Sequence, residues 1–221
     1  MNGQEIPDSN VILDTLEAHF KIPVIQDAAS TAVGRSVAVM LENHTIKIGF
    51  YWRYGHHMTE FIEKVCTETF PRGVIKSWKF YQPLGTKLAN YFSGLGRHSL
   101  AELIHFSCQD LQAVSDILST KEFFTGDTPT RIDCTLFGHL VQFVYMPMDL
   151  PQKEYMLSHA DNLVRYVDRV RKRLWPDWDQ MCAKACMEGY MGKDYMDMLL
   201  KETNENSPAI LSNNDSAKKG L

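Results

Sequence analysis

Apolar side chains recur every three or four residues along most of the chain, and this spacing predicts amphipathic helices. The first long run begins after Ser30 and continues to Arg53. Its apolar positions keep the helical spacing throughout: Val33, Val37, Met40, Leu41, Ile48, Tyr51 and Trp52. Gly55 follows, and a glycine just past the last turn is typical of a helix end. We therefore expect the first long helix over residues 30–53.

The segments that follow Gly55 are less regular. Residues 56–69 fit one more short helix, which would stop before Pro71. In residues 74–92, Pro83 and Gly85 favour a break with helix on either side, because proline removes a backbone donor and crowds the preceding turn.

Later helices carry clear apolar stripes. The stripe after Ser99 comprises Leu100, Leu103, Ile104, Leu111, Val114, Ile117 and Leu118. The helix that starts at residues 130–133 is apolar nearly all round, so we expect it to be buried at the centre of the domain. A single helix is expected over residues 151–174, with apolar positions Met156, Ala160, Leu163, Val167, Val170 and Leu174. A last helix is expected from about Pro176 to Leu200.

Two of these helix starts carry a capping-box pattern, in which a Ser or Thr hydroxyl meets the backbone N–H three residues on and an acidic side chain reaches back. Ser99 is paired in this way with Glu102, and Thr130 with Asp133. Because such contacts satisfy the unpaired N–H groups of a helix start, we assign these four residues a structural role and not a catalytic one.

The two ends of the chain differ from its middle. Asp8 or Ser9 is expected to cap a short helix that Pro23 ends, and this helix is too short to bury its apolar face without docking on another element. Residues 202–221 are rich in Asn, Ser and Lys and are predicted to be disordered. Strand patterns are nearly absent, so the sequence predicts an all-α fold with one helical domain over residues 30–200.

Composition narrows the class of protein. The 221 residues are 44% hydrophobic and 23% charged with a net charge of −4, which is ordinary globular composition and does not favour nucleic acid as a partner. The sequence contains no run of about 18 apolar residues, so no membrane-spanning helix is predicted. The N-terminus has no secretory pattern, and a cytoplasmic location is therefore expected.

Candidate metal ligands and disulfides are few. The five cysteines are odd in number and unpaired in spacing, which argues against a disulfide framework: Cys66, Cys108, Cys134, Cys182 and Cys186. Cys182 and Cys186 share a helix face, but no second pair completes a metal site. His56 and His57 are sequence neighbours and do not share a helix face. We therefore predict no metal.

Three motifs, in order along the chain, carry a resemblance to known proteins. Residues 6–13 (IPDSNVIL) resemble the end of the thioredoxin-like domain of glutathione transferases, where an acidic residue and a serine open the third helix. Residues 124–133 resemble the loop and Ser/Thr-x-x-Asp box that open the central helix of the transferase helical domain. Residues 94–99 (GLGRHS), with the helix that contains Asp110, resemble the failed-axon-connections family, which is related to metaxins.

The resemblance implies a glutathione transferase C-terminal-like helical bundle, preceded in residues 1–22 by a remnant of a thioredoxin-like α/β domain. In transferases the pair that matches Asp8 and Ser9 holds the γ-glutamyl end of glutathione, and a helix N-terminus suits a carboxylate. Asp8 and Ser9 are therefore the predicted substrate-binding residues, with simple helix capping as the alternative. The chain begins after the position of the transferase catalytic Tyr, Ser or Cys, so no catalytic residue is predicted.

These features favour a non-catalytic binding or adaptor module of the failed-axon-connections type, with no cofactor other than glutathione as a ligand. A protein partner or a homodimer is expected, because a missing half-domain would leave an apolar strip open on the first long helix and on residues 151–174. The alternative is a glutathione-dependent transferase, for detoxification or stress response, whose catalytic N-terminal segment is missing from this chain. A membrane-associated import role, implied by the metaxin kinship, is disfavoured by the lack of a hydrophobic anchor at the C-terminus.

Overall fold

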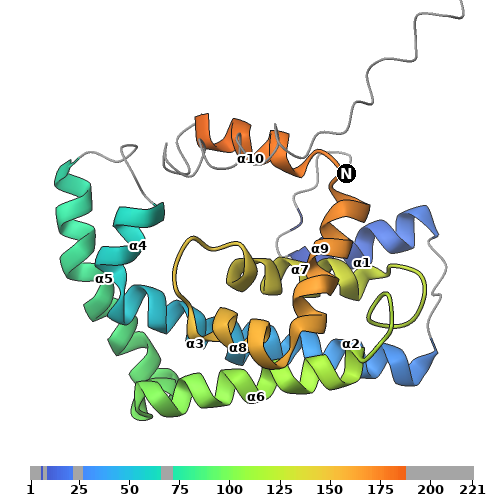
Figure 1. The fold of residues 1–221 in the computed structure, drawn as a ribbon, viewed down its shortest axis with the longest axis horizontal. Helices are drawn as coiled ribbons and strands as arrows, with labels where there is room; N and C mark the ends of the chain where they lie inside the picture. The colour runs from blue at the N-terminus through green and yellow to red at the C-terminus, as the bar shows by residue number, and fades with distance from the viewer. Residues whose placement is uncertain (1–5, 7–8, 22–26, 66–71, 188–221) are drawn as a thin grey trace, which may run out of the picture.

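A computed structural model of the chain describes residue 6 and residues 9–21, 27–65 and 72–187. All regular structure in these residues is helical, as Figure 1 shows, and the predicted all-α class is confirmed. The α-helices are α1 (Ser9–Phe20), α2 (Ala28–Met40), α3 (Ile46–Phe50), α4 (Met58–Val65), α5 (Arg72–Ser93), α6 (Leu100–Leu118), α7 (Arg131–Val144), α8 (Pro151–His159), α9 (Asp161–Leu174) and α10 (Trp178–Met187). Two π-helical turns, η1 (Leu41–Thr45) and η2 (Tyr51–His56), and the 3₁₀ turn η3 (Leu95–Arg97) complete the list.

The first long helix is one rod made of α2, η1, α3 and η2, and it ends near Gly55 as predicted. Gly49 lies where the rod crosses α7. A Cβ atom there would approach a ring carbon of Phe143 to 2.8 Å, so a glycine lets the two helices come close. π-helical turns within α-helices are rare and occur frequently at functional sites.

The main core lies where α2, α6, α7 and α9 meet. Leu136, Leu140 and Phe143 of α7 are fully buried, which confirms that this helix contributes to the centre of the bundle. Its outer side, which includes Cys134, is exposed, so α7 is not enclosed all round as its apolar sequence had suggested. The predicted inward positions of α8 and α9 are also buried: Met156, Ala160, Leu163, Val167 and Val170.

The structure corrects two predicted boundaries. α5 runs without a break from Arg72 to Ser93, with Pro83 inside it, and packing against η2 supports it. The segment 151–174 is two helices, because Ala160 leaves the helical conformation at φ −137° and ψ 47°. No proline or glycine marks that break, so the apolar spacing continues across it without a local signal.

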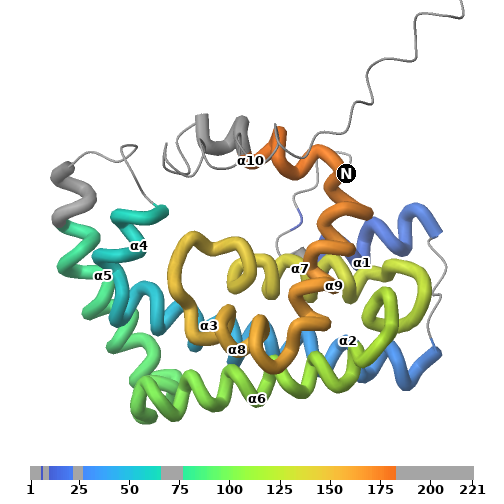
Figure 2. Tube along the Cα trace, in the orientation of Figure 1, coloured from blue at the N-terminus to red at the C-terminus, as the bar shows by residue number. Residues whose placement is uncertain are grey.

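The arrangement separates two ends of the molecule. Figure 1 shows α2, α3 and α6 along the long axis, with α4 and α5 at one end and α1 at the other. In Figure 2 the chain can be followed out along α2 and α3 to α4 and α5, and back along α6. The end that contains α4 has its own cluster of buried side chains, formed by Trp52, Met58, Phe61, Ile62, Met148 and Leu150.

Candidate functional site

The predicted glutathione-binding pair lies at the edge of the described residues. Ser9 is the first residue of α1, while Asp8 lies outside the described residues. Their role at a glutathione site therefore stays a prediction. The predicted tail, residues 202–221, and the part of the last helix beyond Met187 also lie outside the described residues.

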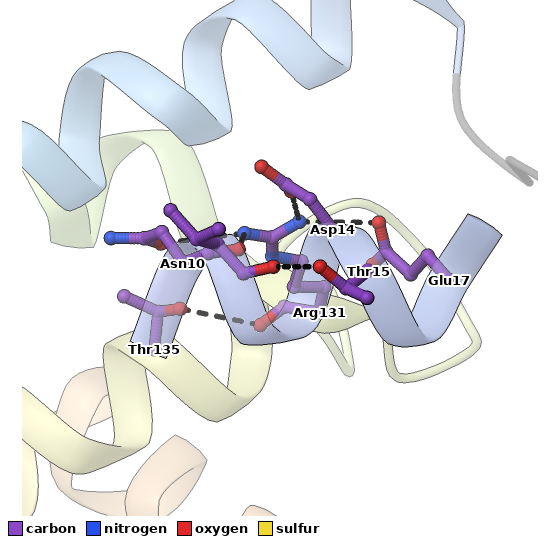
Figure 3. Close-up of polar contacts among 7 residues, drawn as sticks. Asn10, Asp14, Thr15, Glu17, Arg131 and Thr135 are labelled. Carbon is purple, nitrogen blue, oxygen red and sulfur yellow. Dashed lines mark hydrogen bonds and ion pairs between the residues drawn. The ribbon is translucent and has the colours of Figure 1, made fainter. Parts of the chain in front are cut away.

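Arg131 holds α1, the helix that Ser9 opens, against the start of α7 (Figure 3). Its guanidinium donates to the carboxylates of Asp14 and Glu17, the second at 3.1 Å. It also donates to the backbone and side-chain oxygens of Asn10, both at 3.3 Å. Three residues of α1 thus accept hydrogen bonds from one arginine. These hydrogen bonds fix the short helix on the bundle.

The start of α7 is organised around the buried carboxylate of Asp133. Oδ2 accepts hydrogen bonds from the backbone N–H and the hydroxyl of Thr130, at 2.8 and 3.0 Å. Oδ1 accepts from the backbone N–H of Phe124 at 2.8 Å and from the Tyr166 hydroxyl at 2.7 Å. Burial and the neighbouring carboxylate raise the pKa of Tyr166, so its phenol keeps its proton and serves as a donor.

The other capping box lies on the surface. Glu102 accepts from the backbone N–H of Ser99 at 2.8 Å, and the Ser99 hydroxyl accepts from the Glu102 backbone N–H at 3.3 Å. These hydrogen bonds from Ser99 lower the pKa of Glu102 below its usual value.

Asp110 links α6 to the π-helical turn η1. Its Oδ2 lies 2.6 Å from the Thr45 hydroxyl and 2.6 Å from Nδ1 of His44. Asp110 lies in the helix that follows the 94–99 motif, but its partners could not be predicted because Thr45 is 65 residues away in the sequence.

The thiols of Cys108 and Cys134 are poorly suited to nucleophilic catalysis. Burial raises the pKa of Cys108, and burial together with the nearby Asp133 raises the pKa of Cys134, although part of that residue is exposed. A thiol is nucleophilic as its thiolate, so both are expected to be unreactive at neutral pH.

The broadest exposed apolar surface lies on α5. Six large side chains along this helix are more than half exposed and form what we call the α5 face: Phe80, Tyr81, Leu84, Leu88, Tyr91 and Phe92. Phe80 and Phe92 are 71% and 74% exposed. The charged residues in the α5 sequence are all basic: Arg72, Lys76, Lys79 and Lys87. Of these, Lys79 lies 3.5 Å from the carboxylate of Glu63 in α4. Side chains of this kind on one helix typically meet another surface.

A metal cluster or a membrane-spanning helix would each indicate a particular class of site. No group of three or more His, Cys, Asp or Glu side chains is arranged to hold a metal ion within the described part of the chain. Among the helices described here, none is long and apolar enough to cross a membrane.

The middle of the helical bundle, which includes the capping box at the start of α7, matches a known protein family. Residues 107–170, from the middle of α6 to near the end of α9, match the family described as glutathione S-transferase, C-terminal domain. This part of the chain is therefore a transferase-type C-terminal domain.

Individual relatives sharpen that assignment. The chain is 31% identical to failed axon connections of Drosophila melanogaster, across 87% of this chain and 50% of that protein. It is 24% identical to isoprene-epoxide–glutathione S-transferase of Rhodococcus sp. strain AD45, across 78% and 74%. A shorter match, 33% identical across 30% and 21%, is to Metaxin-3 of Danio rerio. The comparison with solved structures gave no match.

These matches confirm the predicted resemblance. The chain is glutathione transferase-like, and failed axon connections and the metaxins are among its relatives. It spans about half the length of the failed-axon-connections protein.

Proposed function

We propose that this chain is a non-catalytic, cytoplasmic binding or adaptor module of the failed-axon-connections type, and that its α5 face is where a protein partner docks. The observation that carries the proposal is the α5 face itself, where apolar side chains are exposed along a helix whose charges are all basic. The polar groups of the α6–α9 bundle support it, because Asp133 and Asp110 are engaged in joining helices.

The charges of α5 favour a partner with an acidic and apolar surface. In a symmetric dimer built on this face, each copy would present the same basic helix to the other. Like charges brought together in this way oppose association, whereas an acidic partner would be attracted. We therefore place a different, acidic protein on the α5 face and treat a homodimer as the competing outcome.

We further propose that α1 corresponds to the third helix of a thioredoxin-like domain, with Asp8 and Ser9 at its start. Its docking through Arg131 supports this, because the arginine fixes α1 against the helix that opens with the transferase-type box. In a binding module, α1 would then serve as a structural part of the bundle.

The experiment tests the α5 face by placing negative charges on it. Leu84→Glu with Leu88→Glu places two carboxylates on the face at positions that are 63% and 55% exposed. Leu157→Glu on α8, where the leucine is 58% exposed, is the matched control. Partner proteins are first identified by cross-linking to the full chain in cells. Each identified partner is then purified, and its binding to the purified chain is measured.

We expect the double variant to weaken binding of the purified partner at least about tenfold, and binding to weaken as salt is raised. The control should bind as the unaltered chain does. A partner that binds the double variant and the unaltered chain equally would place the docking surface elsewhere. Loss of self-association in the double variant, measured by light scattering, would show that the occupant is a second copy.

A glutathione-dependent transferase is the second candidate. It is favoured by the relative named isoprene-epoxide–glutathione S-transferase, which the chain matches over 74% of its length. Retention of the purified chain on immobilised glutathione, together with measurable conjugation, would support this candidate over the binding module.

A further inference from the structure

Arg53 is a buried cation without a polar partner among the described residues. It lies in η2, is only 3% exposed, and its Nε has no hydrogen-bond acceptor. The ion pairs found in the described segments involve other basic residues, such as Arg131 with Asp14 and Arg171 with Asp168. No ion pair of the described residues involves Arg53, so its guanidinium, a group that carries only donors, has no carboxylate partner there.

Three aromatic rings surround this guanidinium. Its central carbon lies 5.4 Å from the ring centre of Phe50, 5.5 Å from that of Tyr54 and 5.8 Å from that of Phe61. The rings also contact one another, since the Tyr54 and Phe61 centres are 5.0 Å apart in an edge-to-face arrangement. α3, η2 and α4 thus contribute one ring each to an aromatic box around one positive charge.

The rings compensate that charge only in part. Each cation–π contact contributes far less than the cost of removing a charge from water, and a buried charge without a counter-ion is strongly destabilising. An arginine kept in such a place is suited to receive an anion, because its planar fork binds a carboxylate through two parallel hydrogen bonds.

We propose that Arg53, with Phe50, Tyr54 and Phe61, binds the carboxylate of a small organic acid whose apolar body lies against the rings. One positive charge matches a monoanion better than a phosphate ester with nearly two negative charges. The negative faces of the three rings would oppose the second charge. This site is separate from the α5 face, and it does not depend on a protein partner there.

Thermal unfolding of the full chain with benzoate as the probe tests the site. Benzamide, which has the same shape without the charge, and phenyl phosphate are the companion ligands. At benzoate concentrations about 100-fold above its Kd we expect Tm to rise by about 5 °C. Benzamide should leave Tm unchanged, and phenyl phosphate should bind more weakly than benzoate.

Arg53→Met removes the charge and keeps an apolar stem, and Arg35→Met on the exposed side of α2 is the matched control. Without ligand, R53M is expected to melt at or above the Tm of the unaltered chain, because an uncompensated charge has been removed. The benzoate effect should vanish in R53M and persist in R35M.

Should R53M fail to fold, Arg53→Lys keeps the charge but loses the planar fork, and its affinity for benzoate should fall about tenfold. Equal Tm shifts in the unaltered chain and the Arg53 variant would overturn the proposal. So would the absence of any saturable benzoate effect on the unaltered chain.

Discussion

At the scale of single residues, Asp133 joins three parts of the chain. Its two oxygens accept from Thr130 at the start of α7, from Phe124 in the preceding loop and from Tyr166 in α9. Charge-assisted hydrogen bonds of this kind are among the strongest in proteins, and removing their acceptor leaves buried donors unpaired.

We therefore predict that Asp133→Ala lowers the free energy of unfolding by about 3 kcal/mol. Thr130→Ala should cost about 1 kcal/mol, as the loss of an N-cap does. Glu102→Ala, in the exposed box of α6, is the control and should cost clearly less than Asp133→Ala. Urea denaturation measures all three, and an Asp133→Ala variant as stable as the unaltered chain would refute the structural role of this carboxylate.

The two thiols of Cys108 and Cys134 predict how the rate of cysteine alkylation depends on pH. The pKa values of Cys108 and Cys134 are raised above the ordinary thiol value of 9.0, so each holds less thiolate at neutral pH than an exposed cysteine does. Alkylation of both by iodoacetamide should be slow at pH 7 and rise only above pH 9. Peptide mass spectrometry of the folded chain, with the urea-unfolded chain as reference, measures the rates. Faster labelling at pH 7 in the folded chain than in the unfolded chain would contradict the assignment.

At the scale of elements, α1 depends on a contact that lies far away in the sequence. Arg131 reaches Glu17 across 114 positions, and the side chain of Arg131 is about one-third exposed. The contact is thus partly screened by water, but it is the ion pair that ties α1 to α7 in the described residues.

Arg131→Met should release α1 while leaving the bundle folded. We expect faster hydrogen exchange of the backbone amides in residues 10–20 and little change in α6 and α9. Arg165→Met, which removes an exposed pair with Asp161 on α9, is the control and should leave α1 exchange unchanged. Unaltered exchange of α1 in the Arg131 variant would show that other contacts hold the helix.

The elements also show what local sequence can predict. The stripes of α6 and α9 were readable because their apolar residues face one core at helical spacing. The continuity of α5 through Pro83 could not be predicted from the local sequence, because packing against η2 overrides the local effect of proline. The break at Ala160 has no breaker residue, and the partners of Arg131 and Asp110 are set by the fold.

At the scale of the whole molecule, the two ends differ in character. The α1 end carries the capping box of Thr130 and Asp133 and the helix that Ser9 begins. The opposite end consists of α4 and α5 (Figure 1). It includes the exposed α5 face and the aromatic box around Arg53. An open apolar strip was expected on the first long helix and on residues 151–174, and Val33, Val39 and Leu157 of these segments are exposed. The most exposed large apolar side chains, Phe92 and Phe80, lie on α5, in the segment whose pattern was ambiguous.

The measurement that tests the central claim most directly is the rate at which the purified full chain conjugates glutathione to an epoxide. A binding module predicts a rate equal to that of glutathione and epoxide alone, whatever the protein concentration. A saturable rate that increases in proportion to protein, and that Ser9→Ala or Asp8→Ala lowers about tenfold or more, would contradict the account and establish a glutathione-dependent transferase.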